Sequence, residues 1–168
     1  MTDLSTLPPL RMLIVEDEAL ISLLIETIVQ ELGHEIAASA FSVAGALAAL
    51  EEREACIDAA MLDINLGGVL AFPVADALAQ RGIPFIFLTA YGAHAVSPRF
   101  SQVRVIQKPF TEKDLADAMA LLQRQRFSQA RRQTSVSRPT VSPPSVPPAE
   151  ARAGRREPPQ QAEAQSHP

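Results

Sequence analysis

The chain has 168 residues, enough for one ordinary domain and a tail, and its formal net charge is −4. The charge is unevenly spread, because the stretch up to Phe127 carries 9 basic and 16 acidic residues. An acidic domain is a poor partner for the phosphate backbone of nucleic acids. We therefore expect no direct DNA binding.

The cellular location is indicated by targeting signals and cysteine content. No apolar run approaches the roughly 20 residues that a membrane helix needs. Residues 1–10 contain Asp3 and a Pro8-Pro9 pair but no basic region typical of a secretory signal. The single cysteine, Cys56, excludes an internal disulfide and fits a reducing compartment. We expect a cytoplasmic protein without membrane contact, in which Cys56 is a small buried side chain.

The first part of the chain alternates apolar runs with amphipathic stretches. Residues 11–15 predict a central strand that ends at the acidic cluster Glu16-Asp17-Glu18. A helix is predicted next, because apolar residues recur at spacings of three and four before Gly33, namely Leu20, Ile21, Leu24, Ile25, Ile28 and Leu32. Residues 34–40 predict a second strand. Ser42 is a candidate N-cap for a helix with the apolar face Val43, Ala46, Leu47 and Leu50.

The same alternation continues through the rest of the domain. Residues 57–62 predict a third strand, followed by a flexible turn at Gly67-Gly68. Pro73 suits the first turn of a third helix, and the apolar run 85–88 predicts a strand buried on both faces. Residues 90–102 carry little periodicity, so any helix there is expected to be short or mobile. Residues 103–106 predict the fifth strand, and a capping pattern of Thr111 and Asp114 opens a last helix, with apolar positions Leu115, Ala118, Met119 and Leu122.

Five successive strand and helix units predict an α/β domain. The connections are long enough for parallel pairing, which favours a flavodoxin-like (βα)5, doubly wound parallel sheet with strand order 2-1-3-4-5. Residues 10–127 would form this domain. Residues 128–168 hold 8 of the 14 prolines together with Arg, Gln and Ser, and no aromatic residue. Such a composition cannot bury enough apolar surface, so we expect a disordered tail.

Polar side chains follow four of the predicted strands. Glu16 and Asp17 follow the first, Asp63 the third, Thr89 the fourth and Lys108 the fifth. The carboxyl ends of parallel strands meet at one edge, where open α/β sheets carry their sites. Each residue also has a plain structural interpretation, such as an acidic helix start, a turn or a surface charge. Their joint position at strand ends favours a site centred on Asp63.

These residue types are suited to phosphoryl chemistry. Carboxylates without a cysteine cluster favour the hard ion Mg²⁺, for which one or two carboxylates suffice. Asp63 would then be free to act as a nucleophile. The Lys108 ammonium and the Thr89 hydroxyl could hold phosphoryl oxygens. The sequence therefore predicts transfer of a phosphoryl group to Asp63, followed by slow hydrolysis.

Four short motifs resemble the receiver domain of bacterial two-component response regulators over roughly residues 10–127: Val15-Glu16-Asp17-Glu18, Leu62-Asp63-Ile64-Asn65, Leu88-Thr89-Ala90 and Lys108-Pro109-Phe110. The resemblance implies that Asp63 is the phosphoacceptor and that Asp17 binds Mg²⁺ directly. It implies that Glu16 acts mainly through a bound water and that the backbone carbonyl of Asn65 completes the metal ligands. By the same resemblance, Thr89 is the switch hydroxyl and Lys108 binds phosphate, next to a cis bond to Pro109.

Residues 84–92 are further similar to a receiver subgroup that reads Pro-Phe-x-Phe-Ala-Thr-Gly-Tyr, whose members are often single-domain proteins. The resemblance implies a phosphoprotein rather than an enzyme, with a sensor histidine kinase or histidine phosphotransferase as donor. Its output would be binding of an unknown downstream protein or storage of phosphate. Two departures stand out: the Gly67-Gly68 loop is expected to be more mobile, and Val105 replaces the usual aromatic switch. Tyr91 then becomes the candidate switch residue beside Thr89.

Two alternatives remain open from the sequence. A phosphohydrolase of the haloacid dehalogenase type also uses a nucleophilic aspartate, Mg²⁺, a threonine and a lysine. Such enzymes need a second acid two residues after the nucleophile, where this chain has Asn65. The other alternative is a receiver-like interaction module that is never phosphorylated.

Overall fold

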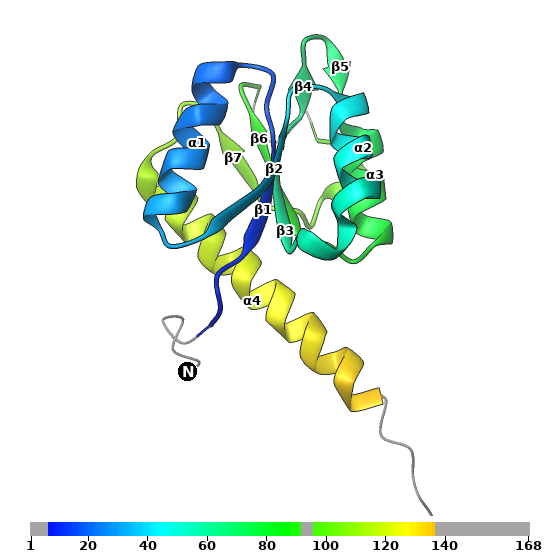
Figure 1. The fold of residues 1–168 in the computed structure, drawn as a ribbon. Coiled ribbons are helices and arrows are strands. Elements are labelled where there is room, and N and C mark those ends of the chain that lie inside the picture. The colour runs from blue at the N-terminus through cyan, green and yellow to red at the C-terminus, as the bar shows by residue number, and fades with distance from the viewer. Residues whose placement is uncertain (1–6, 92–95, 137–168) are drawn as a thin grey trace, which may run out of the picture. The chain divides into compact units, whose positions relative to one another are not determined.

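A computed structural model describes residues 7–91 and 96–136. Five parallel strands form the central sheet in the order β2-β1-β3-β6-β7 (Figure 1), and their bounds are β1 (Arg11–Val15), β2 (Glu35–Ala40), β3 (Ala59–Asp63), β6 (Phe85–Thr89) and β7 (Val105–Gln107). β6 and β7 are the predicted fourth and fifth strands, because β4 and β5 form a separate two-stranded sheet. The predicted flavodoxin-like order is confirmed.

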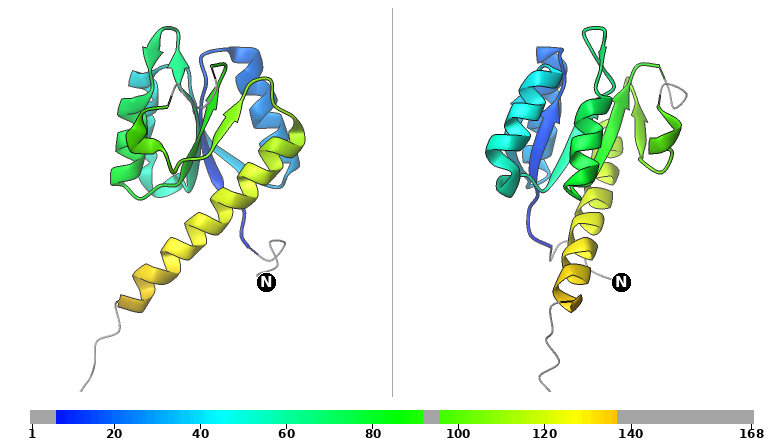
Figure 2. Two further views of the ribbon diagram at one scale, coloured as in Figure 1. Left: turned by 180° about the vertical axis from the view of Figure 1, so that it is seen from behind. Right: turned by 90° about the vertical axis from the view of Figure 1, so that its right-hand side faces the viewer.

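Helices cover both faces of this sheet (Figures 1 and 2). One face carries α1 (Ala19–Glu31) and α4 (Glu112–Val136), and the other carries α2 (Val43–Arg53) and α3 (Phe72–Gln80). Every residue of β3 and of β6 is buried, since both strands lie inside the sheet and are covered from both sides. Asp63 and Thr89, the last residues of these two strands, are thereby held at the carboxyl edge of a rigid core.

Helix α1 contacts the sheet through most of the predicted apolar positions: Ile25 and Ile28 are in the core, and Ile21 and Leu32 pack against it. Two of the predicted positions lie outside this face. Leu20 and Leu24 are 83% and 50% exposed, whereas Ser22 and Val29 are buried. Apolar residues occur on almost every side of this helix, so their spacing gave the buried face correctly at four positions and added Leu20 and Leu24 at its side. Ser22 is accommodated there because its hydroxyl donates to Glu26 Oε1 at 2.9 Å.

The predicted flexible turn after Asp63 is a paired β-hairpin. β4 (Asn65–Leu66) pairs antiparallel with β5 (Val69–Leu70). Gly67 and Gly68 lie between them with φ of 61° and 92°, as a two-residue turn of type I′ requires. The turn therefore has a defined conformation, and its mobility stays a prediction.

The connection from β6 to β7 includes the 3-10 helix η4 (Pro98–Phe100), while residues 92–95 lie outside the described part. Arg99 attaches this segment to α3. Its Nη2 lies 2.8 Å from Asp76 Oδ2, and its guanidinium carbon lies 5.0 Å from the ring centroid of Phe100 and 5.7 Å from that of Phe72. In the described residues 96–102 of this weakly periodic segment, Arg99 therefore makes contacts with both α3 and Phe100.

Four phenylalanine rings fill the core beneath η4. Phe87 lies at the centre, with centroids 5.4 Å from Phe85, 5.6 Å from Phe100 and 6.3 Å from Phe72. These three contacts are edge-to-face, and Phe72 stacks on Phe100 at 6.0 Å. The cluster joins β6, α3 and η4 in one packed unit.

Helix α4 begins at the predicted capping pattern. The Thr111 N–H donates to Asp114 Oδ2 at 2.8 Å, and the Asp114 N–H donates to Thr111 Oγ1 at 3.2 Å. The helix continues to Val136, beyond the expected domain end at Phe127. Residues 137–168, the larger part of the predicted disordered tail, lie outside the described residues.

Two further observations concern the environment of the chain. Cys56 ends the 3-10 helix η2 (Glu54–Cys56) and is exposed, contrary to prediction, because the adjacent Ile57 takes the buried position with 1% exposure. Among residues 7–91 and 96–136, no helix is long and apolar enough to cross a membrane.

Asp58 joins the amino end of β3 to two other elements. Its Oδ2 lies 2.8 Å from Arg11 Nε, and its Oδ1 lies 3.2 Å from Arg126 Nη2 of α4. Burial by itself raises the pKa of Asp58, but the hydrogen bonds and charge of Arg11 and Arg126 outweigh it and hold the pKa below the ordinary 3.8. A lowered pKa means that the ionised carboxylate stabilises the fold above pH 3.8, and that this contribution is lost as the pH falls through the lowered pKa.

We expect Asp58→Asn to lower the free energy of unfolding by about 2 kcal/mol at neutral pH, because a buried charge-assisted network loses its anion. The matched control is Asp117→Asn, whose solvent-exposed ion pair with Lys113 is screened, so its loss should change the free energy of unfolding far less. Urea unfolding should show the gap between wild type and Asp58→Asn closing well below pH 3.8. A gap that is equal in acid and at neutral pH would contradict this account.

Candidate functional site

Lys108 reaches across the carboxyl edge of the sheet to two buried carboxylates. It follows β7, and its backbone N–H donates to the carbonyl of Thr89 at 2.8 Å. Its Nζ donates to Asp63 Oδ2 at 2.6 Å and to Glu16 Oε2 at 2.7 Å. The peptide bond from Lys108 to Pro109 is cis, as the resemblance implied.

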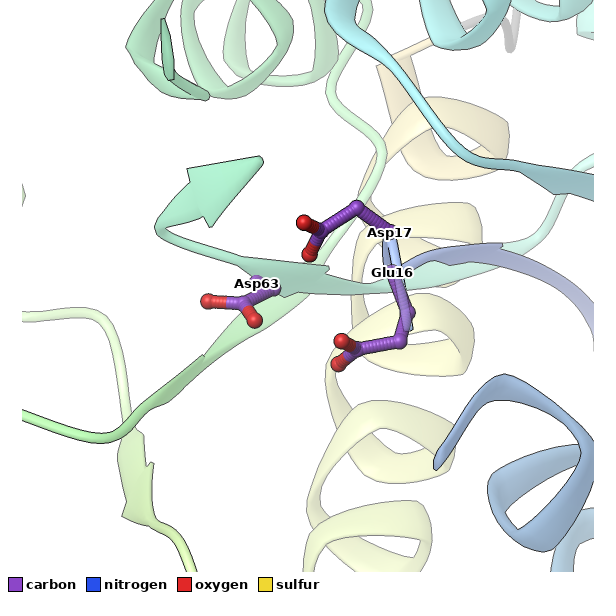
Figure 3. A group of neighbouring side chains, drawn as sticks. All are labelled: Glu16, Asp17 and Asp63. Atoms are coloured by element: carbon purple, nitrogen blue, oxygen red, sulfur yellow. The ribbon is translucent and has the colours of Figure 1, made fainter. Parts of the chain in front are cut away.

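Three carboxylates gather at the ends of β1 and β3. Glu16, Asp17 and Asp63 each offer an oxygen atom, and these oxygens lie within 4.8 Å of one another. Figure 3 shows the three side chains facing the same space, with Glu16 and Asp17 reaching from the end of β1 toward Asp63. Three close carboxylates repel one another unless a cation lies between them. Because only oxygen donors are present, the set fits Mg²⁺ or a similar hard ion.

The three carboxylates differ in exposure. Glu16 is 0% and Asp63 6% exposed, whereas Asp17 is exposed to solvent. A cleft of about 240 Å³ opens beside them, lined by Asp17, Glu18, Asp63, Asn65, Gly67, Ala90, Tyr91 and Lys108. A phosphoryl group could therefore approach Asp63 from this cleft, while Glu16 lies beneath it.

The buried charges influence one another. Burial raises the pKa of Glu16 and the Asp63 carboxylate raises it further, against the opposing effect of Lys108. Burial lowers the pKa of Lys108, but its hydrogen bonds to Asp63 and Glu16 outweigh burial and leave the pKa above its ordinary value. Lys108 therefore stays protonated at neutral pH, with Asp63 and Glu16 as hydrogen-bond acceptors.

Thr89 and Asn65 flank Asp63. Asp63 pairs with Leu88 in the register of β3 and β6, so Thr89 lies one residue further along the neighbouring strand. Thr89 is 1% exposed, and its Oγ1 accepts a hydrogen bond from the Tyr91 N–H at 3.0 Å. The Asn65 N–H donates to Asp63 Oδ1 at 3.1 Å. The carboxylate of Asp63 is therefore held by Lys108 on one oxygen and by Asn65 on the other.

The other two switch candidates lie in different environments. Tyr91 is 61% exposed and lines the cleft. Val105 is half-buried and packs against the core on the α2 and α3 side of the sheet. The structure thus brings Glu16, Asp17, Asp63 and Lys108 together, with Thr89 and Asn65 beside them. The bond between Lys108 and Glu16 was not predicted, because no spacing rule relates the ends of β1 and β7.

The fold and the site define a class: a flavodoxin-like α/β domain with a carboxylate cluster and a lysine at the carboxyl edge of its sheet. Comparison with protein families matches residues 12–120 to the response regulator receiver domain. The chain belongs to this family, so it is a receiver domain of the kind that two-component systems use. The predicted family and fold are confirmed.

Solved structures of response regulators are similar to this chain. SdrG from Sphingomonas melonis Fr1 is 45% identical with a TM-score of 0.61, and the match covers 68% of this chain and 96% of SdrG. The BeF3-activated conformation of SdrG from Pseudomonas melonis Fr1 is 44% identical with a TM-score of 0.58, covering 73% of this chain and 99% of the other. PhyR from Brucella abortus is 28% identical with a TM-score of 0.63, and 80% of this chain matches 54% of PhyR. No curated protein sequence matches this chain.

Proposed function

We propose that this chain is a response regulator that accepts a phosphoryl group on Asp63 from a sensor histidine kinase or a histidine phosphotransferase. The observation that carries the proposal is the environment of Asp63, with Lys108 Nζ at 2.6 Å and two further carboxylates beside it. In the transfer, an Asp63 oxygen attacks phosphorus and the bond from phosphorus to the histidine nitrogen breaks. The leaving imidazole keeps the electron pair and takes up a proton.

We propose Mg²⁺ as the cofactor, with Asp17, Asp63 and the Asn65 backbone carbonyl as ligands and Glu16 acting through a bound water. The oxygen-only cluster supports this choice. When bound, the ion supplies positive charge against the phosphoryl oxygens. Asp17, the exposed member of the three, stands at the cleft where the ion would enter.

The remaining site residues would stabilise and sense the phosphoryl group. Lys108 can transfer a hydrogen bond from the Asp63 carboxylate to a phosphoryl oxygen, because its second acceptor, Glu16, keeps the side chain in the site. The Thr89 hydroxyl can donate to another phosphoryl oxygen while it accepts from the Tyr91 amide. Slow hydrolysis at Asp63 would return the protein to its starting state.

The output would be protein binding that depends on phosphorylation, or storage of phosphate. The similarity to SdrG, whose solved forms include a BeF3-activated conformation, supports a conformational response. The domain boundaries, residues 10–127 followed by a disordered tail at 128–168, and the cytoplasmic location stay predictions, although helix α4 includes residues 128–136 of that tail. So does the switch role of Tyr91, whose backbone N–H is directly bonded to the Thr89 hydroxyl.

A haloacid dehalogenase type of phosphohydrolase is a weaker candidate. The position that needs its second acid holds Asn65, whose side-chain oxygen already accepts a hydrogen bond from Gly68. A module that is never phosphorylated is also disfavoured, because a buried set of Glu16, Asp63 and Lys108 imposes a desolvation cost that interaction alone does not require.

The proposal is tested by phosphoryl uptake. Full-length protein incubated with acetyl phosphate and Mg²⁺ should gain one phosphoryl group by intact mass, in a bond that is stable in acid and cleaved by alkali. The same product should form from a phosphorylated histidine kinase. Failure to gain phosphate from either donor, with Mg²⁺ present, would contradict the proposal.

Lys108→Ala should chiefly weaken the coupling of phosphate to conformational change, because Nζ is the group that can exchange Asp63 for a phosphoryl oxygen. The measurement is the change in backbone NMR shifts on adding beryllofluoride and Mg²⁺. We expect the wild type to show shifts that extend beyond the cleft and Lys108→Ala to show only local ones. Lys113→Ala, at an exposed lysine on α4, is the control and should respond like wild type. Equal long-range shifts in Lys108→Ala would disprove the role.

A further inference from the structure

Asn65 is bonded both to the nucleophile and to the turn that follows it. Its backbone N–H donates to Asp63 Oδ1 at 3.1 Å, and its side-chain Oδ1 accepts from the Gly68 N–H at 2.8 Å. Asn65 is half-buried and is the first residue of β4. Its carboxamide oxygen is therefore engaged in closing the hairpin.

The hairpin is fixed to the core at its base. Ile64 and Leu66, on either side of Asn65, are 2% and 5% exposed. The Ala71 N–H donates to the carbonyl of Ile64 at 2.9 Å, which joins the end of the hairpin to its beginning. The register of β4 and β5 pairs Asn65 with Leu70. The backbone around Asn65 is thus held in place by residues that do not line the cleft.

The turn of the hairpin lies against the carboxylate cluster. Gly67 lines the cleft, and a Cβ at this position would lie 3.7 Å from Asp17 Oδ2. The closed hairpin therefore places its turn close to the carboxylate that is the proposed direct cation ligand. An open hairpin would release both Gly67 and the backbone of Asn65 from this place.

We infer that the Asn65 side chain is a positioning residue for the cation site. By bonding the Gly68 amide, it closes the β4–β5 hairpin and holds the Asn65 backbone, whose carbonyl is the proposed third protein ligand, beside Asp17 and Asp63. The inference rests on the proposed function. It gives the Asn65 side chain a role in addition to the proposed metal ligation by the Asn65 carbonyl. Removing a group that orients a metal ligand typically weakens metal affinity by about 10- to 100-fold.

The test compares Asn65→Ala with wild type in the full chain without phosphate. Titration calorimetry with Mg²⁺ should give about 10-fold weaker binding in the variant, the lower end of the range for groups that orient a ligand. The NMR signal of the Gly68 amide should shift, and its exchange with solvent should become faster. The midpoint of thermal unfolding shows whether the variant is folded.

Two further variants separate positioning from general damage. Asn65→Asp keeps an acceptor oxygen, so the Gly68 amide signal should return toward that of wild type, with Mg²⁺ bound at least as tightly. Val69→Ser changes a hairpin side chain that is 57% exposed, and it should leave both Mg²⁺ affinity and the solvent exchange rate of the Gly68 amide unchanged.

The possible results distinguish the inference from the proposed function. A shifted Gly68 amide with unchanged Mg²⁺ affinity in Asn65→Ala would overturn the inference. Weaker Mg²⁺ binding with an unchanged Gly68 amide would overturn it too, because the side chain would then act on the ion directly. Absence of phosphoryl uptake by wild type would instead contradict the proposed function. The Mg²⁺ titration would still test the role of Asn65.

Discussion

Asp63→Asn should abolish phosphoryl labelling by acetyl phosphate. An amide oxygen is a far weaker nucleophile than a carboxylate oxygen, and the variant also removes one negative charge from the cluster with Glu16 and Asp17. The amide is close in shape to the carboxylate, so Lys108 can keep its bond to Glu16. The measurement is intact mass after incubation with donor and Mg²⁺, followed by peptide mapping of the wild-type product.

The matched control is Asp76→Asn, at an exposed carboxylate on α3 that pairs with Arg99. It should take up phosphate at the wild-type rate. A labelled Asp63→Asn protein with wild-type stoichiometry would exclude Asp63 as the phosphoacceptor and with it the proposed function.

Asp17→Asn should lose Mg²⁺ dependence and labelling together. Asp17 is the exposed member of the cluster, whereas Glu16 is fully buried with one oxygen bonded to Lys108. Removing its charge should weaken Mg²⁺ binding by about 100-fold, the upper end of what is found for groups that merely orient a ligand. Calorimetric titration with Mg²⁺ and the initial labelling rate measure the two effects.

Glu18→Gln provides the comparison for Asp17→Asn. Glu18 also lines the cleft but does not belong to the set of close oxygens, so its loss should change Mg²⁺ affinity only slightly. If Glu18→Gln and Asp17→Asn weakened Mg²⁺ binding equally, the overall negative charge of the cleft would explain binding better than direct ligation by Asp17.

The carboxyl edge of the sheet was predictable because the end of each strand is determined by residues that are close together in the sequence. A strand that is buried on both faces ends where the first charged residue follows its apolar run. In a parallel sheet these carboxyl ends lie at the same edge. This reasoning placed Asp17, Asp63 and Lys108 correctly at one edge. It also identified the cap at Thr111, since its hydrogen bonds span only three residues.

Features set by tertiary contacts were not predictable in the same way. The edge of the buried side of α1 depends on the sheet beneath it, so the sequence did not show that Val29 is buried while Leu20 and Leu24 are exposed. The β4–β5 hairpin has two residues in each strand, too short for alternation to be recognised. The bond from Lys108 to Glu16 spans 92 positions of sequence. Its strength depends on burial, which the sequence does not state.

The four phenylalanines under η4 place a constraint on how the chain can diverge. Each ring lies close to at least two of the others, and the cluster joins the three consecutive elements α3, β6 and η4. A smaller side chain at Phe87 would leave space that neither Phe72 nor Phe100 can fill without moving α3 or η4. Substitutions here are therefore expected to arise in compensating sets during evolution, so that related chains should differ at several of these positions together or at none.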